Sequence, residues 1–118
     1  MEKTLYHYKA YVTAVYDGDT ITVDIDLGLK TFIKGEKIRL YGINAPELRG
    51  VERPEGLISR DFLRETILNK NIFVRTFKDK KGKYGRYLGE IYLPDKKGKF
   101  INVNDLLVKK GLAVYAKY

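Results

Sequence analysis

The sequence predicts a small α+β fold, a curled five-stranded β-barrel with helices packed outside it. Three observations lead to this fold: an alternating apolar pattern near the N-terminus, an amphipathic segment after Pro46, and a second strand pair followed by a helix with clear end signals. The order of three strands, helix, two strands and helix fits a closed barrel. At 118 residues, the chain is expected to form one domain, residues 1–118.

The first three strands are predicted from period-two alternation. Residues 8–26 form two strands joined by a tight turn at Asp17-Gly18, a dipeptide that supplies positive backbone torsions in hairpins. A loop and a third strand through residues 37–43 follow, with Arg39 and Tyr41 on one face. The side chains expected on the core face of these strands are Val12, Ala14, Ile21, Val23, Ile25, Ile38 and Leu40.

The middle of the chain changes from helical to strand character. Residues 54–70 place Ile58, Phe62 and Ile67 near helical spacing, with charged residues between them, which predicts an amphipathic helix. Residues 71–77 are rich in β-branched and aromatic side chains, which favours a strand. A charged turn over 78–85 leads to the answering strand at 86–93, and residues 94–99 form a further turn.

The last helix has the strongest local signals. Asn102 can cap its N-terminus, Asp105 occupies the third helical position, and Ile101 can pack against Leu106. Gly111 follows two lysines and provides the left-handed residue that ends such helices. The sequence therefore predicts both ends of this helix.

Composition limits the classes of function. The chain has 23 Lys and Arg against 15 Asp and Glu, a formal net charge of +8, which favours a polyanionic partner such as nucleic acid or an anionic membrane surface. The absence of cysteine excludes disulfides, zinc–cysteine clusters and thiol nucleophiles. No segment has signal-peptide or membrane-span character, so we expect no membrane insertion; the chain is cytoplasmic as written, or secreted if a leader was removed.

The residues able to do chemistry are carboxylates, amides and arginines. His7, the sole histidine, precedes the first strand, and no serine lies in a nucleophile context, so acyl transfer of the Ser-His type is not expected. The remaining side chains suit the handling of phosphate with a hard cation.

Three short stretches carry these groups, and each also has a plainer interpretation. "DGDT" at 17–20 is either a simple hairpin turn or the place where Asp19 binds a metal. "RLYGINAPE" at 39–47 is either a solvated strand end or a site in which Arg39 binds phosphate, Asn44 a cation and Glu47 activates water. "YGR" at 84–86 is either a basic hairpin tip or a second phosphate clamp at Arg86. In the second interpretation, Lys83 and Tyr84 lie at the rim of the cleft.

These stretches, followed by "INVNDLLVKKGLA" at 101–113, resemble in order and spacing the thermonuclease (staphylococcal nuclease-like) family. The resemblance extends from about Tyr11 to Ala113. It implies a five-stranded OB-fold barrel with flanking helices and calcium-dependent hydrolysis of phosphodiester bonds in DNA, in RNA or in both.

The resemblance also implies roles for individual residues. Asp19 matches a carboxylate metal ligand, and Ala45 stands where a backbone carbonyl contributes to the same ion. Glu47 matches the proposed general base, and Arg39 and Arg86 match the two phosphate-binding arginines. The departure from the family is Asn44, which stands where a second metal-binding aspartate is usual. With one negative charge fewer, the site should bind calcium more weakly or take another divalent cation.

Two hypotheses follow. The first is a metal-dependent nuclease, expected to act as a monomer on DNA or RNA. The second is a non-catalytic OB-fold module that binds nucleic acid or protein and has a degenerate metal site, which Asn44 slightly favours. Because Asp19, Arg39, Glu47 and Arg86 are all present, the sequence favours the nuclease.

Overall fold

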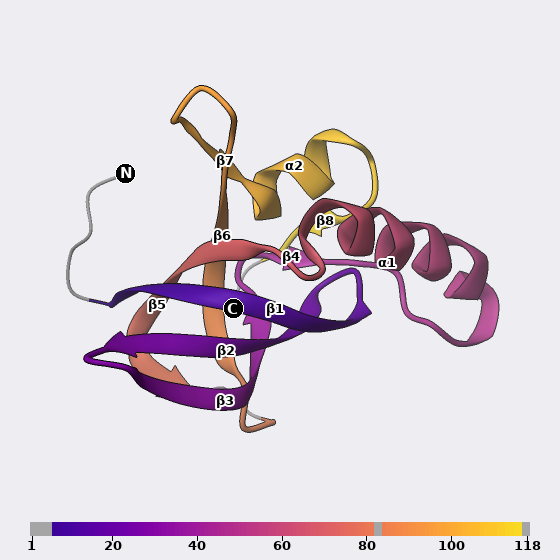
Figure 1. Cartoon of the computed structure of the whole chain (residues 1–118). Helices are drawn as coiled ribbons and strands as arrows, with labels where there is room; N and C mark the ends of the chain where they lie inside the picture. The colour runs from indigo at the N-terminus through magenta and orange to yellow at the C-terminus, as the bar shows by residue number, and fades with distance from the viewer. Residues whose placement is uncertain (1–5, 82–83, 117–118) are drawn as a thin grey trace.

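The computed structural model describes residues 6–81 and 84–116, within which five strands close a barrel. Their order around the barrel is β3-β2-β1-β5-β6 (Figure 1), and a short parallel pairing of β3 with β6 through Ile38–Leu40 completes the circle. The strand bounds are β1 His7–Asp17, β2 Thr20–Gly28, β3 Thr31–Leu40, β5 Asn71–Lys81 and β6 Tyr87–Pro94. The predicted five-stranded barrel with outer helices is confirmed.

Shorter elements complete the fold. Strand β7 (Phe100–Asn102) extends the sheet beyond β6, and β4 (Ile43–Asn44) pairs with β8 (Val114–Tyr115). The 3₁₀ helix η1 (Gly50–Glu52) leads into α1 (Arg53–Ile67), which packs against β1, while α2 (Val103–Lys109) packs against β6 (Figure 1). These short strands have two or three residues each, too few to show alternation. Among the described residues, no helix is both long and apolar enough to cross a membrane.

A β-bulge in β1 changes which side chains enter the core. Val12 pairs with Val23, but the next pairs are Ala14 with Thr22 and Val15 with Ile21, so the register shifts by one residue. Ala14 is therefore exposed and Val15 is buried, contrary to the prediction that Ala14 faces the core. An extra residue in one strand inverts the facing of all that follow. The bulge also turns Tyr16 outward, with 68% of its surface exposed.

The turn between β1 and β2 comprises Gly18 and Asp19, and its backbone differs from the prediction. The φ of Gly18 is not positive, so this glycine is not needed for a left-handed torsion. It is needed for space: a methyl group there would lie 2.7 Å from Cβ of Ala45 and 2.8 Å from Cβ of Ser59. The turn is thus pressed between the β4 exit and α1, and this contact brings Asp19 to the 44–47 segment.

The third strand also differs from its prediction. β3 begins at Thr31, because Leu29 and Lys30 form a two-residue hairpin turn with φ of 53° and 62°. Such positive torsions at both positions match the right-handed twist of hairpin strands. The strand ends at Leu40, and Gly42 follows with φ of 80°. The chain therefore breaks between Arg39 and Asn44 and does not run through as one strand.

Helix α1 buries Ile67 as expected, but the rest of its buried face differs from the prediction. It buries Gly56, Ser59, Leu63 and Ile67, whereas Ile58 is 59% exposed and Phe62 is half-buried. The buried residues are three and four positions apart, as in an amphipathic helix, but two of them are small and let the helix approach the barrel closely. A hydrophobicity pattern gives no weight to Gly56 and Ser59, so the sequence did not show this face.

Helix α2 begins and ends as predicted. The side chain of Asn102 accepts a hydrogen bond from the Asp105 backbone N–H, and Gly111 has φ of 74°. Within the helix, buried Asn104 donates to the carbonyls of Tyr41 and Gly89 and accepts from the N–H of Ile91. These three bonds fasten α2 to the barrel next to the end of β3.

Candidate active site

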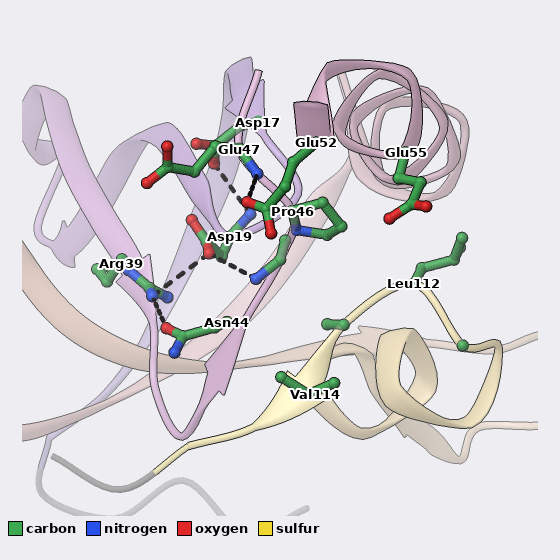
Figure 2. A pocket seen from close by; sticks show the side chains of 13 residues that line it. Asp17, Asp19, Arg39, Asn44, Pro46, Glu47, Glu52, Glu55, Leu112 and Val114 are labelled. Carbon is green, nitrogen blue, oxygen red and sulfur yellow. Dashed lines mark hydrogen bonds and ion pairs between the residues drawn. The ribbon is translucent and has the colours of Figure 1, made fainter. Parts of the chain in front are cut away.

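Two adjoining pockets of opposite charge lie beside the β1–β2 turn. The first, here called the acidic pocket, has a volume of about 700 Å³ and contains one arginine, Arg39. Its carboxylates are Asp17, Asp19, Glu47, Glu52 and Glu55. Asn44 and Ala45 also line it (Figure 2). The second, here called the basic groove, has a volume of about 890 Å³ and shares Glu47 with the first. Its basic side chains are Lys37, Arg49, Arg60, Arg64 and Arg86.

Asp19 lies at the centre of the acidic pocket and is 8% exposed. Its Oδ2 accepts a 2.8 Å hydrogen bond from the Ala45 N–H and lies 3.3 Å from Nη2 of Arg39 (Figure 2). A buried carboxylate requires such partners because desolvation otherwise disfavours its charge. The two bonds tie the β1–β2 turn to both ends of the 39–45 segment.

Arg39 is held from several directions at the end of β3. Its Nη1 donates to the carbonyls of Leu40 and Ile43 at 2.8 and 3.0 Å, and its Nη2 donates to Oδ1 of Asn44 at 2.6 Å. The chain break at Gly42 makes this possible, because it folds the Ile43 and Asn44 oxygens back over the guanidinium. The rigid fork of Arg39 is thereby fixed in the pocket.

Asp17 is a pocket residue that the sequence analysis treated as part of the turn. Its Oδ1 accepts a 3.0 Å hydrogen bond from the Asp19 N–H, and its carboxylate lines the acidic pocket. Burial, followed by the nearby charge of Asp19, raises the pKa of Asp17 to about 6. Two carboxylates at i and i+2 across a tight turn are a signal that the sequence offered, and it could have indicated this pair.

Glu47 lies where the two pockets meet. Its backbone N–H donates to Oε1 of Glu52, and its carboxylate is 66% exposed, 3.7 Å from Nε of Arg49. Its backbone rests on Gly56 of α1, where an added methyl group would collide with the Glu47 carbonyl, 2.8 Å from the carbon. Gly56 is thus a second residue that the sequence analysis missed, and no motif marked it.

Arg86 lies in the basic groove and reaches the acidic pocket through one intermediary. Its Nη1 donates to Oγ1 of Thr20 at 3.2 Å, and that hydroxyl donates to Oδ1 of Asp19 at 3.3 Å. Its guanidinium lies 5.1 Å from the ring centre of Tyr84, an exposed side chain in the same groove. Lys83 falls outside the described residues.

Comparison with known proteins places this architecture in a family. Residues 37–118 match the staphylococcal nuclease homologue family. The chain belongs to that family. It is 36% identical over 108 residues to a protein of Escherichia coli O157:H7 described as an uncharacterized endonuclease, covering 91% of this chain and 61% of that protein. It is 32% identical over 105 residues to the thermonuclease of Staphylococcus intermedius, covering 86% and 56%.

A third relative has a similar identity and coverage. An uncharacterized protein of Methanocaldococcus jannaschii is 30% identical over 130 residues, covering 91% of this chain and 58% of that protein. The chain spans about three-fifths of the length of the curated relatives it matches. The relatives therefore have further residues outside the shared part.

The oxygen donors of this staphylococcal nuclease homologue fit a hard divalent cation. Asp17 and Asp19 place two carboxylates in one pocket with Asn44 and Ala45, and burial, followed by the charge of Asp19, raises the pKa of Asp17. Among residues 6–81 and 84–116, no group of three or more His, Cys, Asp and Glu side chains is arranged to hold a metal. A cation here would thus rely on neutral oxygens and water for much of its coordination, which suits Ca²⁺ or Mg²⁺.

Proposed function

We propose that this chain is a metal-dependent phosphodiesterase that hydrolyses DNA or RNA, with Ca²⁺ or a related divalent cation as cofactor. The observation that carries the proposal is one shared pocket. Asp19, Arg39, Asn44, Ala45 and Glu47 line it together, and Arg86 connects to Asp19 through the Thr20 hydroxyl. As part of the same proposal, residues 1–118 form one domain that acts as a monomer.

The roles follow from charge and position. Hydrolysis adds water across one P–O bond through a five-coordinate species that carries extra negative charge on its equatorial oxygens. Arg39 and Arg86 are the fixed donors that stabilise this charge more than that of the ground state. Asp19, Asn44 and the Ala45 carbonyl, with Asp17 nearby, would hold a divalent cation, which would supply a further positive charge to stabilise that species.

Glu47 is the proposed general base. Its exposed carboxylate stands at the junction of the two pockets, where a water molecule and a phosphate can both reach it. It would accept a proton from the attacking water, within hydrogen-bond distance. Tyr84 and Lys83 are proposed to contact the substrate at the rim.

A second function has one observation in its favour. Asn44 is neutral, and its side-chain oxygen already accepts the 2.6 Å bond from Arg39. That arrangement suits a non-catalytic module that binds nucleic acid or protein with a degenerate metal site. Against it, Arg39 and Glu47 line the acidic pocket and Arg86 lines the adjoining groove with Glu47, which supports the nuclease proposal.

One experiment separates the two functions. Single-stranded DNA and RNA are incubated with the protein across a calcium titration, then with Glu47→Gln and Arg86→Ala. Metal-dependent cleavage that falls by about 10²-fold or more in each variant supports the nuclease. Matched controls are Glu65→Gln and Arg75→Ala, which change similar charges outside both pockets. Binding of either nucleic acid without cleavage, whichever divalent ion is supplied, supports the module.

A further inference from the structure

The acidic and basic side chains are separated between the two pockets, and the proposed hydrolysis does not explain this separation. The acidic pocket has five carboxylates around one arginine, while the basic groove has five cationic side chains around one carboxylate, Glu47. Of these cations, only Arg86 has a role in the proposed hydrolysis. Lys37 and Arg60 come from β3 and α1, and neither lines the acidic pocket.

The groove also contains an exposed aromatic side chain, Tyr16, that is not part of the buried core. Tyr16 follows the β-bulge, is 68% exposed, and its hydroxyl makes no hydrogen bond to the described residues. The bulge itself is held by Arg64, which donates twice to the Val15 carbonyl at 3.3 and 3.1 Å. An exposed ring on a strand, in a groove lined by cationic side chains, has the features of a base-stacking platform.

We infer that the basic groove binds the polynucleotide strand beyond the scissile phosphate, with Tyr16 stacking on a base and Lys37 and Arg60 contacting backbone phosphates. This rests on the proposed function for the identity of the strand. Continuity supports the inference, because Glu47 lines both pockets and Arg86 reaches from the groove toward Asp19. A strand bound at Arg86 would therefore continue into the basic groove.

The two kinds of contact make different contributions. Lys37 is exposed and makes no ion pair within the described residues. The Arg60 side chain is 24% exposed and donates two hydrogen bonds to its helix neighbour Asp61, for which a phosphate would compete. Phosphate contacts give salt-dependent affinity without base preference. Stacking on Tyr16 adds affinity that depends on bases and not on charge.

The test measures binding of a fluorescent 12-nucleotide oligothymidylate by anisotropy, in EDTA so that no cleavage occurs. Tyr16→Ala is expected to weaken binding about tenfold, while Tyr16→Phe, which keeps the ring, binds as the parent protein does. Tyr11→Ala, an exposed tyrosine of the same strand outside the groove, is the control. Binding of inorganic polyphosphate, which has no bases, should be unchanged in Tyr16→Ala.

A second experiment tests the proposed phosphate contacts with a double variant. Lys37→Gln with Arg60→Gln is expected to reduce the slope of log affinity against log salt concentration by about 1.4, because each single-strand phosphate contact contributes about 0.7. Lys96→Gln with Lys97→Gln removes the same charge from the turn before β7 and should leave the slope unchanged. With calcium present, the groove variants should raise KM for the oligonucleotide more than they lower kcat.

The outcomes distinguish this inference from the proposed function. If Tyr16→Ala and the double variant bind the oligonucleotide like their controls while the parent protein cleaves it, the groove inference is wrong and the nuclease stands. If no condition gives cleavage but both groove variants weaken binding as expected, the groove inference stands and the nuclease fails. If Tyr16→Ala weakens polyphosphate binding equally, the groove binds polyanions in general and the stacking role is overturned.

Discussion

The Nη2 of Arg39 donates a 2.6 Å hydrogen bond to the side-chain oxygen of Asn44. The same nitrogen lies 3.3 Å from Oδ2 of Asp19. The proposed phosphate-binding arginine thus contacts both of the side chains proposed to bind the cation. The positive charge of Arg39 offsets part of the negative charge that would attract a metal. Because Asn44 is neutral, the site also has less negative charge than it would have with an aspartate at this position.

Restoring a carboxylate at this position should strengthen metal binding. Asn44→Asp is expected to lower the calcium concentration for half-maximal cleavage by about tenfold, because ligand charge is one control on calcium affinity. The measurement is initial rate against calcium concentration at constant ionic strength. Asn71→Asp adds the same charge at an exposed position of β5, outside both pockets, and should not shift the curve. An unshifted curve for Asn44→Asp would remove Asn44 from the ligand set.

The contact between Gly56 and Glu47 predicts a loss of activity together with a loss of stability. Gly56→Ala should gain about 0.5–1 kcal/mol in helix propensity, but the added methyl group overlaps the Glu47 backbone, which must move, so the free energy of unfolding should fall overall. Misplacement of the proposed base should lower kcat by about 10- to 100-fold. Urea unfolding and cleavage kinetics measured on the same sample check both parts. Glu65→Ala, on an exposed position of α1, should change neither appreciably; a Gly56→Ala variant with full activity contradicts the positioning role.

The raised pKa of Asp17 predicts that this residue lowers the stability of the folded protein at neutral pH. A carboxyl group whose pKa is about 6 in the folded state and has its ordinary value of 3.8 in the unfolded chain binds more protons when folded. The free energy of unfolding therefore falls as pH rises through this window. Asp17→Asn should be more stable than the parent protein at pH 7.5, by about 1 kcal/mol for this half-buried group, and the gain should vanish near pH 4. Urea unfolding in EDTA at several pH values measures this.

The control for Asp17→Asn is Asp61→Asn, which removes an exposed carboxylate outside both pockets. It should show no comparable gain at pH 7.5. A parent protein that remains the more stable form throughout the pH range would contradict the assigned burial and repulsion at Asp17.

Two asparagines at the start of α2 should differ in their contributions. Asn104 is 3% exposed and makes three hydrogen bonds to the barrel backbone, so Asn104→Ala removes all three and takes away the side-chain acceptor of the buried Ile91 N–H. We expect a loss of about 2–4 kcal/mol in the free energy of unfolding. Asn102→Ala removes one capping bond and should cost about 1 kcal/mol. Chemical denaturation of both variants tests the ranking, which equal losses would refute.

Where sequence reasoning succeeded, the signals were local. The cap at Asn102 and the stop at Gly111 depend on a few neighbouring residues, and both are present in the structure. Alternation predicted β1 and β2, but it placed Ala14 in the core, where the structure has Val15. The bulge inserts one residue into β1, and this reverses which side chains point toward the core. The buried face of α1 was missed because Gly56 and Ser59 pack by their small size and not by hydrophobicity.

Residue types and their order along the chain were enough to indicate a barrel, a nuclease-like family and a set of candidate residues. Their grouping depends on contacts between distant segments. The parallel pairing of β3 with β6 closes the barrel and lets Arg86 reach Thr20, 66 positions away in sequence, while the fit of Gly18 against Ala45 and Ser59 brings Asp19 to Ala45. Such contacts form when the whole chain packs, so no short stretch encodes the division into an acidic pocket and a basic groove.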